Sequence, residues 1–445
     1  MTRRPAAGTQ LTGKTVAWSS SAPTIATVSS TGRVLPVGPG VAIITATTEG
    51  SQASASVSIT RGRGLRVASM MSYDSIIPAM MARYGVPGAS IAIMRNGRLV
   101  LARGYGYADS AARTLVEPTS LFRIASLSKP ITSAAIMKLV EQGSLRLDDK
   151  AFLILSDVRP ANTSTMDQRL LDITIRQLLT HSGGWDRDSN GDPMFMSTTA
   201  ASATGTRAPA DLQAILKDWM SKPLDFTPGT RYAYSNLGFA VLGLVVEKVS
   251  GQSYEAFVKS AVLRPAGATH MQLGHTLVSQ RAADEVQYYE PGTTTSVFPD
   301  GGTVAWPDGG FYLEPMAAHG AWIASAPDLL RFSAAVDGFP ERPDILSASS
   351  LAEMTARPSF WTGATPWYGF GWLVNSSGNW WHNGSLPGTS TLLVRTSGNV
   401  SWAIFLNSRT TPSGVPDIGA AIDREMWAAF KRVTVWPSHD LFDRY

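Results

Sequence analysis

The sequence contains no cysteine, which excludes disulfide bonds, thiolate metal sites and cysteine nucleophiles. Long apolar runs are also missing: none approaches the roughly 18 residues that a membrane-spanning helix needs, so no transmembrane segment is expected. Charge is sparse, with 16% charged residues and a formal net charge of only +4. The densest basic cluster, 61–66, is short and typical of a solvated linker, so we expect no nucleic-acid partner.

The rest of the composition is that of an ordinary globular protein. Hydrophobic residues make up 44% of the 445 positions, enough for a large core, and the length allows two or three domains. Residues 14–60 differ from the remainder of the chain, because they are rich in Ser, Thr, Val, Ala and Gly and carry almost no charge. Alternating runs at 41–47 and 53–59, separated by Gly or Pro, are typical of strands in a small all-β sandwich.

Four blocks in this region occur in the order of a known family. They are Trp18–Ser21, Ile25–Val28, Gly32–Val34 and Pro39–Thr47, and together they resemble a bacterial immunoglobulin-like (Ig-like) domain of group 2. The resemblance covers the later part of that module, since its opening strands would lie upstream of Thr15. We therefore expect the chain to begin inside the domain and the sandwich to be incomplete, with an unpaired edge strand or a partner elsewhere. No signal peptide is visible at Met1–Pro5. A missing upstream segment would be the part of the protein that carries one.

From about Met71 the pattern changes to mixed α and β. Runs at 89–94 and 98–105 flank Arg95-Asn96-Gly97, which predicts a hairpin with an Asn-Gly turn. Periodicity predicts helices from 126 to before Gly143 and at 169–180, 237–260 and 420–433, and strands at 368–374, 389–396 and 400–407. Early strands that pair with late ones predict an α+β fold, one antiparallel sheet covered by helices. The predicted parts are an all-β module (1–61), a linker (62–72), a mixed domain (73–435) and a tail (436–445).

A serine and a lysine stand three residues apart at the start of the helix that begins at Ser126. In Ser126-Leu127-Ser128-Lys129 the first and last side chains project from the same helix face, so the hydroxyl and the amine share a small volume. A serine hydroxyl is a poor nucleophile until a base removes its proton, and an amine with a lowered pKa can do so. The pattern alone arises often by chance, so its weight depends on two further motifs.

The second motif is Tyr234-Ser235-Asn236, between the Pro228-Gly229 turn and an apolar helix. The phenol can relay a proton to a leaving group if a nearby cation lowers its pKa, and the asparagine can bind substrate or hold the lysine. The third motif is His382-Asn383-Gly384-Ser385, before the strand that starts near Thr389. Its glycine allows close approach of a substrate to a strand edge, and the amides of Ser385 and Ser126 are the predicted oxyanion donors.

Together these motifs resemble the serine β-lactamase and penicillin-binding protein superfamily, with Leu178–Gly184 similar to a segment of its class C branch. The resemblance covers about 71–433. It implies a β-lactamase-like antiparallel sheet flanked by helices, with a helical subdomain. It also implies that Ser126 is the acylated nucleophile and that Lys129 and Tyr234 form the general-base pair. Which of these two takes the first proton stays open.

The resemblance further implies that substrate contacts Asn236 and the strand edge formed by His382, Asn383 and Gly384. Class A and C β-lactamases carry Lys-Thr-Gly as this third motif, and the loss of the lysine removes a fixed cation for a substrate carboxylate, because a histidine is mostly neutral at pH 7. The departure argues against a dedicated β-lactamase and resembles certain D,D-peptidases and esterases of the β-lactamase-like type (family VIII). The Gly-x-Ser-x-Gly pattern of α/β-hydrolases is absent, and its nearest match, Gly88–Ala92, leads into a predicted strand.

Other residues suggest weaker roles. Asp186–Asp192 resembles the first half of a calcium loop, but position twelve would be Ser197, which favours a polar loop whose carboxylates cap turns. His181 is expected to be structural. No metal-ligand spacing links His270, His275, His319 and His439, and we expect no metal and no cofactor. The long segment 186–228 predicts a functional loop in the wall of an acyl pocket. Five tryptophans either line that pocket or pack in the core: Trp361, Trp367, Trp372, Trp380 and Trp381.

The sequence thus predicts a serine hydrolase acting through an acyl-enzyme, and favours a carboxylesterase on small to medium acyl esters that allows weak β-lactam hydrolysis as a side activity. One alternative is a D,D-peptidase or β-lactamase acting on cell-wall-like substrates, and another is a non-catalytic surface-binding protein. The expected partner is a small-molecule ester, and the Ig-like module is expected to contact a surface or the catalytic domain. Because that module resembles parts of extracytoplasmic proteins, we expect a periplasmic or secreted bacterial protein.

Overall fold

The N-terminal region forms five short strands that lie beside the main body. The computed structural model describes residues 15–445 except 38–39, 50, 60–61, 364 and 411–417. The strands β1 (Ala17–Ser20), β4 (Gly40–Thr48) and β5 (Ser51–Ile59) pair in the order β1-β4-β5, and β2 (Ala26–Val28) pairs with β3 (Val34–Pro36). Ala26, Ala42 and Ile44 form the small core of this all-β module. Its predicted incompleteness stays a prediction, because the segment upstream of Thr15 lies outside the described residues.

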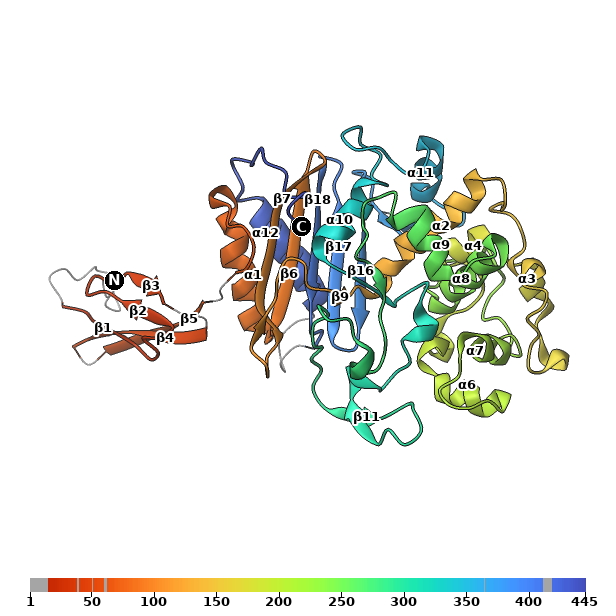
Figure 1. Cartoon of the computed structure of the whole chain (residues 1–445), viewed down its shortest axis with the longest axis horizontal. Coiled ribbons are helices and arrows are strands. Elements are labelled where there is room, and N and C mark those ends of the chain that lie inside the picture. Colours follow the sequence, from red (N-terminus) through yellow and green to blue (C-terminus); the bar gives the residue numbers. More distant parts are fainter. Residues whose placement is uncertain (1–14, 38–39, 50, 60–61, 364, 411–417) are drawn as a thin grey trace.

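The main body is built on an eight-stranded antiparallel sheet of order β14-β15-β16-β17-β18-β6-β7-β8 (Figure 1). Its strands are β6 (Gly88–Arg95), β7 (Arg98–Asp109), β8 (Thr114–Leu115), β14 (Trp367–Tyr368), β15 (Leu373–Val374), β16 (Trp380–Leu386), β17 (Thr389–Arg395) and β18 (Val400–Leu406). Asn96 and Gly97 have φ angles of 47° and 68°, which suit the tight turn between β6 and β7. Since β18 pairs with β6, late strands complete the sheet that early strands begin, as predicted.

Helices cover both faces of this sheet, which confirms the predicted architecture. On one face, α1 (Met71–Tyr84) and α12 (Ile418–Phe430) pack around Tyr73 and Trp402. On the other face lie α10 (Ala326–Ala334) and a helical subdomain (Figure 1). That subdomain and its surroundings contain α2 (Ser128–Glu141), α3 (Ala151–Ile154), α4 (Ile175–Leu179), α5 (Arg187–Asn190), α6 (Ser197–Thr204), α7 (Leu212–Trp219), α8 (Asn236–Ser250), α9 (Tyr254–Val258) and α11 (Ala348–Thr355).

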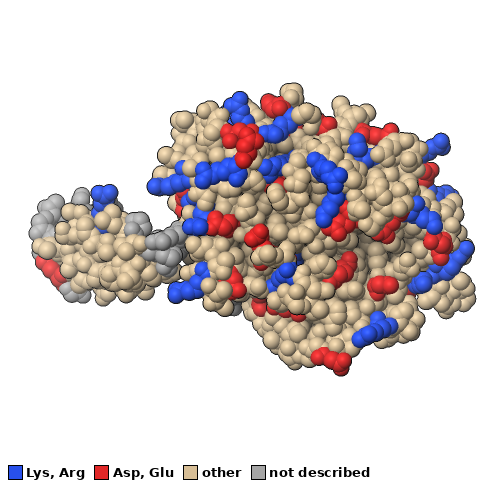
Figure 2. Space-filling model, viewed as in Figure 1, with Lys and Arg blue, Asp and Glu red and all other residues tan. Residues whose placement is uncertain are grey.

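Two smaller sheets complete the body. In one, β10 (Gln272–Leu273), β13 (Trp322–Ala324) and β9 (Phe122–Arg123) pair in the order β10-β13-β9, and in the other β11 (Thr293–Thr295) pairs with β12 (Thr303–Ala305). Figure 2 shows Lys and Arg interspersed with Asp and Glu over the visible face of the main body, and few charged side chains on the N-terminal strands. Across the described ranges, no helix combines the length and the apolar character needed to cross a bilayer.

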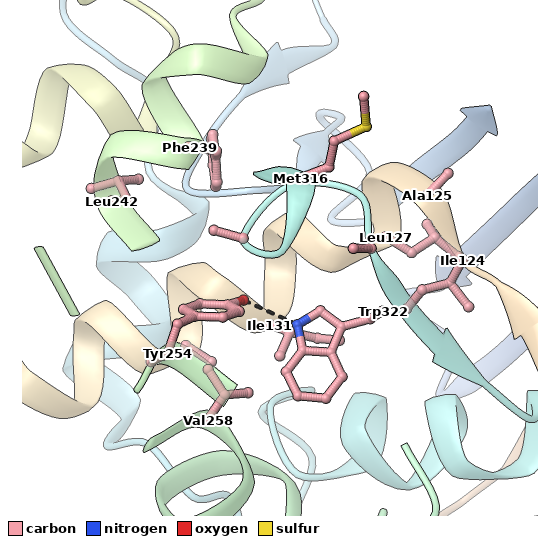
Figure 3. Close-up of a cluster of buried hydrophobic side chains, with 14 of the residues drawn as sticks. Ile124, Ala125, Leu127, Ile131, Phe239, Leu242, Tyr254, Val258, Met316 and Trp322 are labelled. Atoms are coloured by element: carbon pink, nitrogen blue, oxygen red, sulfur yellow. Dashed lines mark hydrogen bonds between the residues drawn. The ribbon is translucent and has the colours of Figure 1, made fainter. Parts of the chain in front are cut away.

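A buried cluster next to α2 fixes the position of that helix (Figure 3). Trp322 Nε1 donates a hydrogen bond to Tyr254 Oη at 3.0 Å, and Tyr254 Oη lies 2.6 Å from Thr132 Oγ1 on α2. Thr132 Oγ1 also donates to the Ala318 carbonyl at 2.6 Å. These polar atoms are buried among apolar side chains, so loss of either partner would leave a buried donor or acceptor without a hydrogen bond. The network therefore holds the segment around Ala318 against α2.

Several predicted elements differ from the structure. The segment 169–180 holds a short 3₁₀ helix followed by α4, and the predicted helix 237–260 is interrupted at Gly251, whose φ of 68° ends α8. The segment 368–374 is a hairpin of two short strands, because Gly371 (φ 76°) turns the chain where it meets Pro130 of α2. The segment 186–228 is no long loop, because it contains α5, α6 and α7.

Candidate active site

The turn that leads into α2 presents Ser126 at a partly exposed position. Ser126 lies in a short 3₁₀ helix, Ala125–Leu127, directly before the first residue of α2. Ala125 has a φ of 51°, a conformation that costs energy for a residue with a Cβ atom and that persists only when its surroundings hold it. Here Ser128 Oγ donates to the Ala125 carbonyl at 2.7 Å, and Thr391 Oγ1 donates to the Ile124 carbonyl at 2.9 Å. The strained turn is thus anchored from both sides.

Three predicted site residues from distant stretches of the chain meet at this turn. Tyr234 Oη donates a hydrogen bond to Ser126 Oγ at 2.8 Å, and Lys129 Nζ lies 3.1 Å from the same oxygen. Lys129 Nζ also lies 4.6 Å from the centroid of the Tyr234 ring. The structure therefore brings hydroxyl, amine and phenol within direct contact distance.

Lys129 is completely buried, and its amine has two further oxygen neighbours. Nζ donates to Asn236 Oδ1 at 2.7 Å and to the His319 carbonyl at 3.2 Å. Burial lowers the pKa of Lys129 well below its ordinary value, while the nearby Asp192 charge opposes that shift and the Arg187 charge adds to it. An uncharged amine has two N–H donors and one lone pair. The two donors match Asn236 and His319, which leaves the lone pair for the proton of Ser126.

Three buried histidines also face Lys129. Burial lowers the pKa of His181 and of His319 well below the ordinary value, and it lowers the pKa of His382 to about 3. The charge that Lys129 carries when protonated depresses all three pKa values further. These histidines are therefore neutral near pH 7. The third motif consequently contributes no cation through its histidine, in agreement with the sequence-based expectation.

The phenol of Tyr234 keeps its proton in this arrangement. Burial raises the pKa of Tyr234 above its ordinary value, although the hydrogen bond with Ser126 and the charge of Arg187 act in the lowering direction. Arg187 extends from α5, and its guanidinium carbon lies 4.4 Å from the centroid of the Tyr234 ring. The cation that the sequence argument required beside this tyrosine is thus present, but burial outweighs it.

The third motif lies on β16, beside the turn of Ser126. An added Cβ atom at Gly384 would lie 2.5 Å from the Ile124 carbonyl oxygen, so only glycine allows β16 to approach this closely. The next residue, Ser385, is exposed, as is Asn383. The two predicted oxyanion donors, the amides of Ser126 and Ser385, therefore belong to segments in direct contact.

His382 points into the body of the protein and is only 3% exposed. Its Nδ1 lies 2.6 Å from the Asn383 carbonyl oxygen, which only accepts, so Nδ1 carries the proton. Its Nε2 then accepts a hydrogen bond from the Tyr368 hydroxyl at 2.9 Å. Both ring nitrogens of His382 are thus occupied by protein partners, and the predicted contact of His382 with substrate stays a prediction.

Aromatic rings border this constellation. The Tyr232 ring packs on Trp361 and on Tyr368, with centroid distances of 5.1 and 5.7 Å, and the His181 ring lies 4.3 Å from that of Tyr234. His181 Nδ1 accepts from the Ser235 amide at 3.1 Å, so it supports the second motif structurally. Among the tryptophans near the third motif, Trp372 and Trp380 are buried in the core.

The polar run Asp186–Asp192 acts differently from a calcium loop. Asp186 accepts from the Asp188 amide and caps α5, and Asp192 accepts from the Met194 amide and caps the next short helix. Within the described part of the chain, no group of three His, Asp or Glu side chains is arranged to hold a metal ion. Asp192 Oδ2 also accepts from Asn236 Nδ2 at 2.5 Å. The contacts of Arg187 and Asp192 with the second motif were not predicted from the sequence, where the charged run 186–192 was the local signal for them.

Comparison with known proteins identifies the family of each part of the chain. Residues 73–424 match the family model described as Beta-lactamase. The chain belongs to the Beta-lactamase family. Residues 2–59 match the model of the bacterial Ig-like domain (group 2). Both resemblances stated from the sequence are therefore confirmed at the level of the family.

Individual relatives of this Beta-lactamase family member are distant. Penicillin-binding protein 4* of Bacillus subtilis is 28% identical over 323 residues, which are 71% of this chain and 66% of that protein, so the chain spans just under two thirds of its length. The D-amino acid amidase of Ochrobactrum anthropi and EstCE1, a hydrolase with promiscuous acyltransferase activity, are each 21% identical with a TM-score of 0.61. Each of these two alignments covers 82% of this chain and 99% of the other. At this identity the two solved structures support the fold alone.

Proposed function

We propose that this chain is a serine hydrolase that forms an acyl-enzyme on Ser126 and acts as a carboxylesterase on small to medium acyl esters. One observation carries the proposal: Ser126 Oγ lies between the amine of Lys129 at 3.1 Å and the phenol of Tyr234 at 2.8 Å. A hydroxyl between a base and an acid is the arrangement that acyl transfer requires. The family hydrolyses small molecules by this chemistry, as the resemblance of the three motifs implies.

In the proposed first step, Lys129 takes the proton of Ser126 while Ser126 Oγ bonds to the carbonyl carbon of the ester. The lowered pKa of Lys129 supports this assignment over Tyr234, whose raised pKa makes it a poor initial base. The carbonyl oxygen, now an oxyanion, accepts from the amides of Ser126 and Ser385.

The tetrahedral intermediate then expels the alcohol. Tyr234 donates its proton to the departing oxygen, and the proton on Lys129 replaces it on Tyr234, so the charges balance at the end of acylation. Water then attacks the acyl-enzyme: it passes one proton to Tyr234 Oη as Tyr234 passes its own proton to Lys129, so the phenol is never left ionised. Lys129 returns that proton to Ser126 Oγ as the acyl group leaves as the acid. Lys129 and Tyr234 thus serve as one proton-transfer pair in both halves of the reaction.

The preference for esters over β-lactams rests on the third motif. His382 is buried, neutral and bonded to Tyr368, so it supplies no positive charge to hold a substrate carboxylate. The aromatic side chains of Tyr232, two residues before Tyr234, and of Trp361, which packs on Tyr232, suit an uncharged acyl or alcohol group better than an anion.

A second candidate function is a D,D-peptidase or β-lactamase acting on cell-wall-like substrates. The observation that favours it is Arg187, a half-exposed cation stacked on the Tyr234 ring. The name of the relative from Bacillus subtilis, a penicillin-binding protein, and that of the amidase from Ochrobactrum anthropi point the same way. We also propose an extracytoplasmic location, which the family and the Ig-like module support, and a contact of that module with a surface or with the catalytic domain.

A panel of three substrates separates these functions. The wild-type protein and Ser126→Ala are compared on a p-nitrophenyl ester series of increasing acyl length, a chromogenic cephalosporin and a D-Ala-D-Ala peptide. Fast turnover of the esters alone, lost in Ser126→Ala, supports the carboxylesterase. Fast turnover of the peptide or the cephalosporin would refute the carboxylesterase and support the D,D-peptidase or β-lactamase. Turnover of none of them would leave a non-catalytic surface-binding protein.

A further inference from the structure

A chain of three polar contacts, through two intervening side chains, connects an acidic residue to the nucleophile. Asp192 Oδ2 accepts from Asn236 Nδ2 at 2.5 Å, and Asn236 Oδ1 accepts from Lys129 Nζ at 2.7 Å. Lys129 Nζ in turn lies 3.1 Å from Ser126 Oγ. Asn236 is only 7% exposed, so water has little access to substitute for either partner of its amide.

The direction of the Asn236 amide decides what Lys129 can do. With its oxygen toward Lys129, Asn236 takes one N–H of the amine, and the lone pair of an uncharged Lys129 remains for the proton of Ser126. With the amide turned over, Nδ2 would face Lys129, and the lone pair would accept from Asn236 in place of Ser126. The two directions are nearly equal in shape, so only the hydrogen-bond partners select between them.

We propose that Asp192 is a positioning residue for the general base: by accepting from Asn236, it fixes the amide in the direction that leaves the Lys129 lone pair to Ser126. A carboxylate has no donor, so Nδ2 of Asn236 must face it. This role rests on the proposed acyl-enzyme function of Ser126, and it assigns a purpose to a segment that the sequence presented as half of a calcium loop.

Asp192 is itself held in place by its local structure. Its second oxygen, Oδ1, accepts from the Met194 amide at 3.1 Å, which caps the short helix Pro193–Phe195. Pro193 and Met194 are buried, so this helix start is anchored in the core. The carboxylate therefore presents one oxygen to its own backbone and the other to Asn236.

The test uses Asp192→Asn and Asp192→Ser. Both remove the same charge, but only the asparagine is expected to turn the Asn236 amide over. Asparagine is as good a helix cap as aspartate. Its single oxygen goes to the Met194 amide, so its NH₂ faces Asn236 and turns the Asn236 amide over. Serine keeps a cap acceptor but is too short to reach Asn236. We expect Asp192→Asn to lower kcat for ester hydrolysis about 10- to 100-fold with little change in KM, and Asp192→Ser to lower it several-fold less.

The pH dependence of kcat/KM separates the proposed role of Asp192 from a merely structural one, because loss of a structural contact alone would not shift it. The charged and titratable groups around Lys129 are Tyr234, Arg187, Asp192, His181, His319 and His382. The charge of Asp192 raises the pKa of Lys129, so both variants are expected to shift the acidic limb of kcat/KM to lower pH. The shift is expected to be larger in Asp192→Asn, because the turned-over Asn236 amide also donates to the lone pair of uncharged Lys129. The control is Asp211→Asn, because Asp211 caps α7 through the Ala214 amide in the same way. It is expected to keep the wild-type rate and profile.

The rate of covalent labelling of Ser126 by a fluorophosphonate is measured in parallel, because it needs an activated serine but no particular ester. Wild-type labelling without ester turnover would refute the carboxylesterase while leaving the role of Asp192 testable by the labelling rates. Folding is checked by thermal unfolding of each variant. Equal kcat and labelling rates in the folded Asn and Ser variants, an unmoved acidic limb, or no labelling of the wild type would each overturn the proposal.

Discussion

Lys129 Nζ lies 3.1 Å from Ser126 Oγ, and across the described residues no carboxylate oxygen contacts that amine. Asp192, the acidic residue whose charge acts on Lys129, is linked to that amine through the neutral amide of Asn236. An ammonium without a direct counter-ion in a buried site loses its hydration with little in return, which is why burial dominates the lowered pKa of Lys129. The same burial that would be costly for a structural lysine makes this one a base.

The first prediction concerns the pH dependence of the wild-type protein. A base must be unprotonated, and the pKa of Lys129 is lowered from the ordinary lysine value of about 10.4, so kcat/KM should rise with pH and level off well below that value. Ionisation of Tyr234 should not lower kcat/KM at moderately alkaline pH, because burial raises the pKa of this phenol. Initial rates on an uncharged p-nitrophenyl ester give the profile. Activity that begins only above about pH 10 would contradict the assignment.

The second prediction concerns Arg187. Its charge lowers the pKa of Lys129, so Arg187→Gln should shift the acidic limb of kcat/KM to higher pH, opposite to the shift expected for the Asp192 variants. Because this guanidinium stacks on Tyr234, the KM of an ester with a carboxylate in its alcohol part should also rise more than that of its uncharged analogue. Arg207→Gln removes the same charge from an exposed position and serves as the control. A limb that stays in place, or moves equally in both variants, counts against the account.

The third prediction concerns stability. The Tyr368 hydroxyl donates to Nε2 of His382, and both side chains are buried. Tyr368→Phe leaves that nitrogen without a donor and should lower the free energy of unfolding by about 1–3 kcal/mol. The matched control is Tyr232→Phe, whose hydroxyl makes no hydrogen bond within the described residues. Urea unfolding measures both, and equal stabilities would contradict the assigned hydrogen bond.

The fourth prediction concerns the approach of β16 to the nucleophile. A methyl group at position 384 would collide with the Ile124 carbonyl and with Thr391, so Gly384→Ala should push β16 away from the turn of Ser126. If the Ser385 amide is an oxyanion donor, kcat should fall about 100- to 1,000-fold. Gly398→Ala is the control, since its Cβ atom would meet only Thr396 at 3.9 Å. A fully active, folded Gly384→Ala protein would remove Ser385 from the proposed oxyanion site.

Several features of this structure are encoded by residues close together in the sequence and were therefore predictable. The hairpin of β6 and β7 follows from alternating apolar residues around Asn96-Gly97, and the contact of Ser126 with Lys129 follows from helical spacing. The placement of Tyr234 at Ser126, 108 residues away, required the family resemblance, because no local pattern encodes it. The sequence predicted that early strands pair with late ones, and the structure shows this pairing between β6 and β18.

The features that the sequence did not predict depend on contacts between residues far apart in the chain. The sequence of α6, 197–204, is rich in Ser and Thr, which are weak helix formers, so packing of Ala200 and Ala201 decides its conformation. Gly371 marks a turn only because the chain there meets Pro130 of α2. The contact of Asp192 with Asn236 joins residues 44 apart, and the burial that raises the pKa of Tyr234 is a property of the assembled site.

Rapid-quench mass spectrometry of the acyl-enzyme tests whether Lys129 is the base, by comparing the wild-type protein with Lys129→Ala. With a p-nitrophenyl ester in excess, we expect one acyl group on the peptide that contains Ser126, formed about 100- to 10,000-fold more slowly in Lys129→Ala. Ser126→Ala should show no adduct. Acylation of another residue, or formation of the Ser126 adduct at the same rate in Lys129→Ala, would contradict the role of the buried amine as the base.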